Sequence, residues 1–410
     1  MARRARAARR ERAPGPAPLN NAAPALLHGV LVAGAIASAL AAIALPVNLA
    51  AFPRLSRAAR GLRPDSRPRV SVVIPARNEA AGIGRAVGSH LAQEYPDLQV
   101  VVVDDCSTDG TGRALEALAR EDPRLTVVAG DEPPEGWLGK PHALWLGSAA
   151  ADGEILLFAD ADVRYDPRTL REAVAVMEGR GLDLLAFFPR LETRGFWESV
   201  LLPYLAVAVF LGLGFLARVR RCPIAMGAGA GNLVRRRVYD TVGGHAALPD
   251  SVVDDVRLAV TVKRAGFRVG AFRAEDRVSV RIYSGFRGVW NGFTKNLAWV
   301  YSGVGGALLF ALTIGLSAVS IAPAAVLAIA AVGGKIAGRD VALAAAVYAS
   351  SVLLRGTLAA VLRDPLWPAL TQPIMAAVWT GLMGRSLFHR FIRRRLTWRG
   401  REFHARSARF

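Results

Sequence analysis

The sequence predicts an α/β domain with a parallel sheet, placed between membrane-spanning helices. Three observations predict it. Four short apolar runs alternate with helical stretches between about residues 70 and 190, acidic residues follow three of these runs, and long apolar segments occupy both ends of the chain. Strands that alternate with helices of this length form parallel sheets covered on both faces. Such sheets bind ligands beyond the carboxyl ends of their strands.

We expect the strands at residues 70–74, 98–103, 125–128 and 155–158, with helices at residues 111–120 and 141–151. Pro75 stops the first strand because proline cannot donate to a strand ladder. The acidic residues that follow the strands are Glu79, Asp104, Asp105, Asp160 and Asp162. Acids after one strand could arise by chance, but acids after three strands indicate a site.

The most informative of these ends is Asp160-Ala161-Asp162, which directly follows the apolar run at residues 155–158. Two carboxylates this close repel each other, so a cation between them is expected. A hard divalent ion such as Mg²⁺ or Mn²⁺ prefers oxygen ligands of this kind. A solvated turn is the alternative interpretation of one such pair taken alone, and the acids at the other strand ends favour the site.

Membrane association is predicted by apolar segments on both sides of this domain. Residues 26–51 are uncharged apart from His28 and exceed the ~20 residues that cross a bilayer. After the domain, residues 341–362 and 366–388 are further candidates. Residues 303–334 contain Pro323 and form either one broken span or two short ones. An even number of spans would keep a basic tail on the side of the domain, and this favours two short elements.

Two apolar segments within or beside the domain are harder to interpret. A single crossing at residues 200–217 would separate Asp160 and Asp162 from Asp255, so we expect a helix that lies in the membrane interface there. Apolar residues recur at helical spacing over residues 286–301, with Arg287 and Lys295 beside them. That pattern predicts either a helix on lipid or a core-facing helix.

The net charge of +19 lies almost entirely in three Arg-rich segments, residues 1–12, 54–69 and 385–410, with +5, +5 and +8. All three flank apolar segments, where basic clusters meet anionic lipid. No nucleic-acid recognition module accompanies them, so nucleic acid is not an expected partner. Only two cysteines, Cys106 and Cys222, are present, which excludes a disulfide framework and a cysteine-based metal site.

Five motifs occur in order along the domain: VVIPARNE at residues 72–79, VDDCSTDGT at 103–111, GKPHAL at 139–144, DAD at 160–162 and DDVRLA at 254–259. This set resembles family 2 glycosyltransferases with a GT-A domain, over roughly residues 68–300. The flanking spans, YSGFR at residues 283–287 and LTWRGR at 396–401 resemble a membrane subgroup, the diaponeurosporenoate (carotenoid) and hopanoid-associated glycosyltransferases.

The resemblance implies a role for each matching residue. Pro75, Ala76, Arg77 and Glu79 would line the nucleotide pocket. Asp105 would contact the uracil edge, and Lys140 would lie near the base or the phosphate. Asp160 and Ala161 would lie at the ribose and the metal. Asp160 and Asp162 hold a divalent metal, Mn²⁺ or Mg²⁺. Asp255 is the catalytic base that takes the acceptor's proton. From the residues alone, Lys140 could be an ordinary loop lysine, and Asp254 and Asp255 could be helix N-terminal acids; for Asp254 we favour the latter.

The implied function is a membrane-bound inverting transferase that moves a hexose from a UDP-sugar to a lipid acceptor, a carotenoid acid or another polyisoprenoid. A processive polysaccharide synthase is the in-class alternative. Its Gln-x-x-Arg-Trp motif is replaced here by residues 284–288 (SGFRG), which keep the Arg but lack the Gln and Trp. A non-catalytic membrane scaffold of the same fold is the other alternative.

The expected organisation follows the composition along the chain. It is a disordered basic arm at residues 1–25, an anchor at 26–52, the GT-A domain at 68–280, an amphipathic interface helix at 281–302, transmembrane helices at 303–389 and a basic tail at 390–410. Because nucleotide sugars are cytosolic, we expect a multi-pass protein of the cytoplasmic membrane with its catalytic domain in the cytoplasm.

Overall fold

The four predicted strands are neighbours in a seven-stranded sheet. The computed structural model describes all residues except 1–21, 63–66, 301–302, 394, 399–400 and 405–410. The strand order is β3 (Leu125–Ala129), β2 (Leu98–Asp104), β1 (Val70–Ala76), β4 (Ile155–Phe158), β8 (Asn232–Arg235), β6 (Leu184–Phe188) and β9 (Val269–Arg273). β1 to β4 pair in parallel, β8 runs antiparallel between β4 and β6, and β6 pairs in parallel with β9. The residues that follow β1, β2 and β4 therefore meet at one edge of the sheet.

Helices cover both faces of this sheet, which is why its central strands are apolar without alternation. One face packs against α3 (Ile83–Leu91), α4 (Thr111–Glu121) and α6 (Thr169–Gly179), and the other against α5 (Gly139–Ala150), α9 (Arg236–Thr241) and α10 (Asp254–Arg264). Val72 and Ile74 belong to the first core and Val73 to the second, as the two-residue period of a strand requires.

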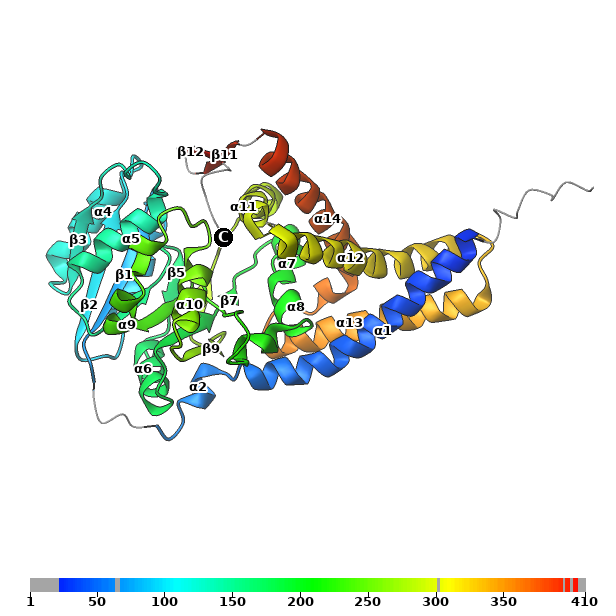
Figure 1. Ribbon diagram of the computed structural model, residues 1–410, viewed down its shortest axis with the longest axis horizontal. Coiled ribbons are helices and arrows are strands. Elements are labelled where there is room, and N and C mark those ends of the chain that lie inside the picture. Colours follow the sequence, from blue (N-terminus) through cyan, green and yellow to red (C-terminus); the bar gives the residue numbers. More distant parts are fainter. Residues whose placement is uncertain (1–21, 63–66, 301–302, 394, 399–400, 405–410) are drawn as a thin grey trace, which may run out of the picture.

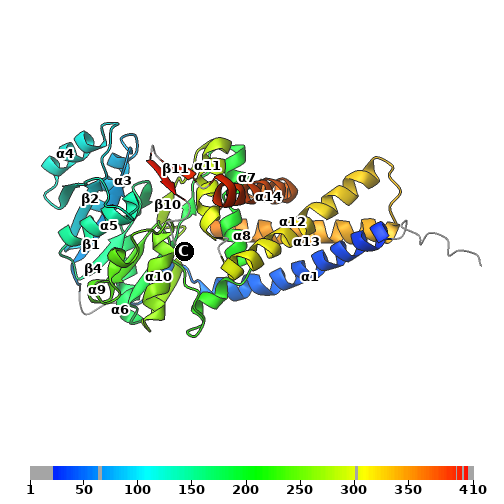
Figure 2. The ribbon, with the colours of Figure 1, turned by 45° about the horizontal axis from the view of Figure 1, so that its top comes forward.

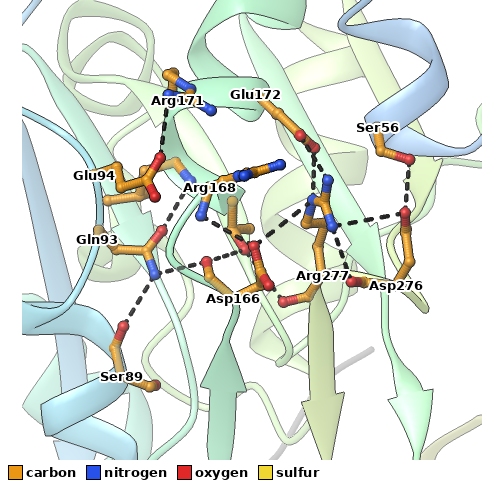
Figure 3. A network of polar contacts seen from close by, with 12 residues as sticks. Ser56, Ser89, Gln93, Glu94, Asp166, Arg168, Arg171, Glu172, Asp276 and Arg277 are labelled. Carbon is orange, nitrogen blue, oxygen red and sulfur yellow. Dashed lines mark hydrogen bonds and ion pairs between the residues drawn. The ribbon is translucent and has the colours of Figure 1, made fainter.

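A small second sheet continues from the end of β4. It contains β5 (Val163–Tyr165), β10 (Val278–Val280) and β7 (Arg190–Leu191). A polar network beside it centres on Arg277, which binds both carboxylate oxygens of Glu172 at 2.8 and 2.9 Å (Figure 3). Ser56, in the short helix α2 (Leu55–Ala58), donates to the neighbouring Asp276 at 2.6 Å. The network thus connects the segment after the N-terminal anchor to the turn that precedes β10.

Long helices project from one end of the domain (Figures 1 and 2). They are α1 (Ala22–Ala51), α12 (Gly303–Ala331) and α13 (Gly338–Leu362). η4 (Trp367–Thr371) and α14 (Gln372–Phe388) follow α13, and α14 lies nearer the domain. In the part of the chain that the structure describes, three segments are long and apolar enough to cross a membrane: Ala23–Ala51, Thr313–Ala331 and Gly338–Leu362. These three helices pack against one another, and α14 packs against α12. These helices support membrane association, and the multi-pass organisation and its boundaries stay predictions.

One expectation about this bundle is wrong. Pro323 does not divide residues 303–334 into two short elements, because α12 continues through it to Ala331. A proline removes only one backbone hydrogen bond from a helix, and membrane helices tolerate this loss when neighbouring helices support them. The structure therefore has two long helices, α12 and α13, between the catalytic domain and α14.

The apolar segment near residues 200–217 is not a long helix. It forms α7 (Phe196–Leu201), α8 (Tyr204–Phe210) and the 3-10 helix η2 (Gly214–Arg218), each too short to cross a bilayer. The next apolar helix, α11 (Gly285–Val300), buries Val289 and Phe293 against α7 and α14. On this face α11 is a core-facing helix, which is one of the two predicted alternatives. Lipid contact by the other faces of α11, and by the α7–α8 segment, stays a prediction.

The predicted tail contains structure that the composition does not indicate. A helical turn, η5 (His389–Arg393), leads to a hairpin of β11 (Arg395–Trp398) and β12 (Arg401–His404). Most of the predicted basic arm, residues 1–21, lies outside the described residues, and the remainder is the first turn of α1.

Candidate active site

The loops after β1 and β2 are connected by hydrogen bonds. The backbone N–H of Thr108 donates to Asn78 Oδ1 at 2.8 Å, and the N–H of Asn78 donates to Ser107 Oγ at 3.0 Å. Asn78 and Cys106 both have positive φ, 54° and 53°, which is uncommon outside glycine. Such backbone strain persists only where surrounding contacts fix it, and it concentrates at ligand sites.

The residues predicted to line the nucleotide pocket gather on these two loops. Pro75 and Ala76 end β1, and the Arg77 guanidinium donates to the backbone oxygen of Asp105 at 2.6 Å. The same guanidinium lies 3.8 Å from the Asp105 carboxylate, whose side chain is 8% exposed. The N–H of Glu79 donates to Thr111 Oγ1 at 2.8 Å. The structure thus brings these predicted residues together, with Arg77 balancing the charge of Asp105.

Lys140 stands among carboxylates that come from distant parts of the sequence. It projects from the first turn of α5, and its Nζ lies 2.7 Å from Asp160 Oδ1 and 3.4 Å from Asp254 Oδ1. Burial opposes ionisation of Lys140, yet Asp160, Asp254 and Asp255 together raise its pKa well above the usual value. Lys140, Asp160 and Asp255 line one pocket with Asp254. Lys140 is therefore not an ordinary loop lysine, because it lies in a helix and faces two carboxylates.

Asp254 lies in the first turn of α10, as expected of a helix N-terminal acid, but it also lines the pocket, which was not expected. Its side chain is 4% exposed, and Oδ1 makes no hydrogen bond with any described residue. Burial raises the pKa of Asp254, Asp255 and Asp160 raise it further, and Lys140 acts against them. Asp254 therefore does more than begin a helix. It belongs to the acidic pocket, and only its position next to Asp255 could have indicated this.

His245 lies behind Asp254, although the sequence analysis gave it no role. Its Nε2 is 3.8 Å from Asp254 Oδ2, too far for a hydrogen bond, and its Nδ1 is 2.9 Å from the Tyr239 hydroxyl. Burial, followed by the charge of Lys140, lowers the pKa of His245 to about 3. A neutral, fully buried imidazole thus separates the acidic pocket from the core.

A glycine-rich loop before β8, residues 227–231, closes the pocket. A Cβ on Gly229 would overlap Asp160 Oδ2, and one on Gly227 would overlap the backbone oxygen of Asp255. Asn232, the first residue of β8, holds the loop in place, since its Nδ2 donates to the same Asp255 oxygen at 2.9 Å and its Oδ1 accepts from Ala228. The glycines are needed here because the backbone passes directly against two site residues.

Ala161 and Asp162 follow in the turn between β4 and β5. Ala161 is buried, and Asp162 is partly buried. The described lining residues of the pocket include Asp160 but not Asp162. The structure therefore brings Asp160, Lys140 and Asp255 together and leaves Asp162 two residues further along, at the margin of the site.

The sequence model of the family described as "Glycosyl transferase family 2" matches residues 71–243, from β1 to the turn after α9. Residues 71–243 are therefore similar to a glycosyl transferase family 2 domain, and we refer to this segment as the family 2 domain. The match contains the Arg77 and Asp105 loops, Lys140, Asp160 and the glycine-rich loop. It ends before Asp254 and Asp255, so the roles of those two residues depend on the pocket geometry described above.

Two curated relatives share this domain. The 4,4'-diaponeurosporenoate glycosyltransferase of Staphylococcus haemolyticus (strain JCSC1435) is 25% identical over 242 residues, 56% of this chain and 61% of that protein. The protein of the same name from Staphylococcus aureus (strain USA300) is 28% identical over 243 residues, 58% of this chain and 62% of that protein. The similarity thus spans less than two thirds of the relatives' length.

A solved structure extends the similarity beyond the family 2 domain. The mannosyltransferase PcManGT from Pyrobaculum calidifontis, in complex with GDP-Man and Mn²⁺, has a TM-score of 0.51 and 25% sequence identity. The match covers 86% of this chain and 98% of that one. The fold of the catalytic domain is therefore GT-A, as the motifs predict.

The pocket of Lys140, Asp160, Asp254 and Asp255 has the chemistry of a divalent-metal site without a closed set of ligands. Among the described residues, no three His, Cys, Asp or Glu side chains are grouped as metal ligands. However, Asp160, Asp254 and Asp255 outnumber the one lysine that faces them, and Asp254 Oδ1 has no hydrogen-bond partner among those residues. Excess carboxylate oxygen is the donor set that Mg²⁺ and Mn²⁺ prefer, so the residues fit such an ion.

We expect Gly229→Ala to lower activity at least tenfold without unfolding the family 2 domain. The new methyl group would displace the Asp160 carboxylate from its contact with Lys140, whereas Gly229 itself is only partly buried. The measurement is initial transfer rate together with thermal midpoint. Gly88→Ala, in α3, is the control, because a Cβ there meets nothing within 4 Å. Equal activity in both variants would contradict the contact.

Proposed function

We propose that this chain is a membrane-bound, metal-dependent inverting glycosyltransferase that transfers a hexose from a nucleotide-diphosphate sugar to a lipid acceptor. The observation that carries the proposal is the convergence of Lys140, Asp160 and Asp255 on one pocket at the carboxyl end of β4, although 115 positions separate the first from the last. Parallel sheets bind nucleotides at such strand ends. The neighbouring loops that contain Arg77 and Asp105 supply the base-binding side.

Each residue then has a task in donor binding. The Asp105 carboxylate accepts hydrogen bonds from the nucleobase, and Arg77, which already contacts Asp105, keeps it oriented. Lys140 lies at the start of a helix and offers a positive charge to the diphosphate. Asp160 and Asp162 would hold the divalent metal together with the diphosphate oxygens. When bound, the metal neutralises the negative charge that develops on the leaving diphosphate.

In this proposal Asp255 acts on the acceptor. The acceptor oxygen attacks the anomeric carbon, the bond from that carbon to the diphosphate oxygen breaks, and the acceptor proton passes to the Asp255 carboxylate. Attack opposite the leaving group inverts the anomeric carbon, and no covalent bond between sugar and protein is needed. The N–H of Val256 donates to Asp255 Oδ1 at 2.9 Å, which orients this carboxylate at the first turn of α10.

Aromatic side chains between the catalytic domain and the bundle support a lipid acceptor. α7, α11 and α14 lie there (Figure 1). Trp197 and Phe286 have ring centroids 4.9 Å apart, and Phe286 stacks on Trp290 at 5.4 Å. Phe196, 47% exposed, stacks on Trp367, 44% exposed, at 5.4 Å. Exposed stacked rings suit a flat polyene chain, in keeping with the names of the curated relatives, and we propose a carotenoid acid or another polyisoprenoid as acceptor.

The donor and the product remain to be identified by a transfer assay. The full chain, in membranes from the expressing cells, is incubated with UDP-sugars and with GDP-mannose, since the sequence motifs favour UDP and the Pyrobaculum calidifontis neighbour holds GDP-Man. Lipid extracts are then analysed by mass spectrometry. A single hexose added to one lipid supports the proposal. A ladder of products would favour a processive synthase, and no nucleotide release with any donor would favour a scaffold.

We expect chelation to abolish this transfer. Treatment with EDTA should lower the rate below about 1% of its starting value, and Mn²⁺ or Mg²⁺ should restore it, because Asp160 and Asp162 cannot neutralise a diphosphate without the ion. Metal-saturated EDTA at the same concentration is the control. Full activity after exhaustive chelation would contradict metal dependence, and comparing the rates with Mn²⁺ and Mg²⁺ identifies the preferred ion.

The proposed topology follows from the donor. Nucleotide sugars are cytosolic, so the family 2 domain faces the cytoplasm and α1 crosses the cytoplasmic membrane. The α7–η2 segment supports this arrangement, because its short helices return the chain to the domain that contains both Asp160 and Asp255.

A further inference from the structure

A second cavity, away from the pocket of Asp160 and Asp255, is strongly basic. It has a volume of about 1430 Å³ and lies among the end of α6, η2 with the following loop, the end of α10 and the starts of β6 and β9. We call it the basic groove. Its charged lining residues are Arg180, Arg218, Arg220, Arg221, Lys263, Arg264 and Arg268, and none of its described lining residues is acidic.

Some of these cations already have structural roles. Lys263 Nζ donates to the backbone oxygens of Ala217 and Ile224, each at 2.6 Å, and so holds the loop between them. Arg180 lies over the Phe272 ring at 5.3 Å. Arg180, Lys263 and Arg264 are at the ends of α6 and α10, where positive charge stabilises the helix dipole. These contacts and helix ends explain only some of the groove's positive charges.

Arg218, Arg220 and Arg221 have no such explanation. All three are exposed, and none of them forms an ion pair with any residue that the structure describes. Together with Arg268 they face a cavity without a neutralising carboxylate, and like charges at this density repel one another. A groove of this kind is complementary to an anion with several negative oxygens, and phosphate is the group that arginine binds in a bidentate manner.

The groove also lies at the level where the first candidate span ends. Asn48, one turn before the end of α1, donates through Nδ2 to the backbone oxygens of Phe210 and Gly212, both at 2.9 Å. These bonds fix α8 and η2 beside the end of α1 nearest the catalytic domain (Figure 2). Of the groove's three unpaired arginines, Arg218 ends η2, and Arg220 and Arg221 lie just after it.

Exposed apolar side chains flank the same arginines. Leu213 is 62% exposed, Val219 45% and Ile224 43%. Alternating exposed apolar and basic residues are typical of segments that lie in the membrane interface, with the apolar side chains in the acyl region and the cations at the headgroups. A soluble anion would need the arginines alone and would not account for these three side chains.

From these observations we infer that the basic groove binds the phosphate headgroup of an anionic lipid in the leaflet that faces the catalytic domain. The groove adjoins the starts of β6 and β9, whereas the pocket of Asp160 adjoins the end of β4, so the two sites are at opposite edges of the sheet. The inference depends on α1 crossing the membrane and not on the proposed transfer reaction. A lipid in this groove would hold the catalytic domain against the membrane surface.

The test is native mass spectrometry of the detergent-purified full chain with added phosphatidylglycerol or with phosphatidylcholine of the same acyl chains. We expect preferential retention of phosphatidylglycerol, weakened at least tenfold in the triple variant Arg218→Gln, Arg220→Gln, Arg221→Gln. The control is Arg85→Gln, Arg113→Gln, Arg120→Gln, which removes the same charge from exposed positions of α3 and α4. A triple Arg→Lys variant, which keeps the charge but not the bidentate geometry, should bind more phosphatidylglycerol than the Gln triple and less than the wild-type chain.

Two further arms separate lipid from other anions. Millimolar inorganic phosphate should not displace phosphatidylglycerol, and rising salt should weaken its retention by the wild-type chain, because ion pairs at an exposed groove are screened. Equal retention of the two lipids, equal loss in the Gln triple and its control, or displacement by inorganic phosphate would each overturn the inference. None of these readings requires an active enzyme, so a failure of the proposed transfer reaction would be seen separately.

Discussion

Asp255→Asn is expected to lower transfer to a hydroxyl acceptor by about 10³-fold, while transfer to a carboxylate acceptor falls less than about tenfold. General-base catalysis contributes about 10²–10⁴-fold, and an asparagine amide cannot take the proton. A carboxylic acid acceptor has a pKa of about 4 and is already ionised near neutral pH, so it barely needs a base. The measurement is initial rate with one acceptor of each kind under saturating donor.

The substitution is conservative in this structure. Asp255 Oδ1 accepts from the N–H of Val256, a bond that the asparagine oxygen can also accept, and Asn232 binds the backbone of Asp255 rather than its side chain. Asp250→Asn is a matched control, because Asp250 precedes the same helix and pairs with Arg257 at 3.1 Å. An inactive Asp255→Asn enzyme whose true acceptor is a carotenoid acid would contradict the assignment of either the base or the acceptor.

Lys140→Met should lower activity at least about 100-fold and also lower the thermal midpoint by several degrees. The change leaves Asp160, Asp254 and Asp255 without the ammonium that faces them, and carboxylates this close repel one another. Removing one partner of a buried ion pair is strongly destabilising, although solvent reaches Lys140, which is 37% exposed, and reduces the effect. Differential scanning fluorimetry and initial rates measure the two effects.

Adding a metal ion tests whether the lower thermal midpoint of Lys140→Met comes from repulsion between the carboxylates or from lost packing. Mn²⁺ should raise the thermal midpoint of Lys140→Met more than that of the wild-type chain, because a divalent cation can replace the missing positive charge among the carboxylates. Activity should not recover, since the diphosphate would still lack its lysine. Lys335→Met, an exposed lysine after α12, is the control. A midpoint that is unchanged by Lys140→Met would show that the ammonium does not stabilise the pocket.

Much of the fold could be predicted because its signals are local. The strands predicted at residues 70–74, 98–103 and 155–158 are found as Val70–Ala76, Leu98–Asp104 and Ile155–Phe158. Pro75 does not stop the first strand, which pairs with β2 through Pro75 to Ala76. A strand buried on both faces requires an uninterrupted apolar run, and such a run can be seen in a single short stretch of sequence. The long N-terminal helix α1 could be predicted for the same reason, since the apolar run expected to cross a bilayer is also local.

The antiparallel insertion of β8 could not be predicted in this way. Its four residues carry no signal of direction, and only its pairing with Leu156 and Leu185 on either side places it in the sheet. The same holds for α12, because whether Pro323 breaks a helix depends on the helices around it and not on the proline.

The sequence by itself determined the order of the motifs, the acids at the strand ends and the apolar segments that flank the domain, since each depends on neighbouring residues. Only the tertiary structure decided that Lys140 faces Asp160 and Asp254, that Gly229 presses on Asp160, and that His245 closes the pocket from behind. These contacts join positions far apart in the chain. Their charges and shapes act on one another only after the sheet, α5 and α10 have packed together.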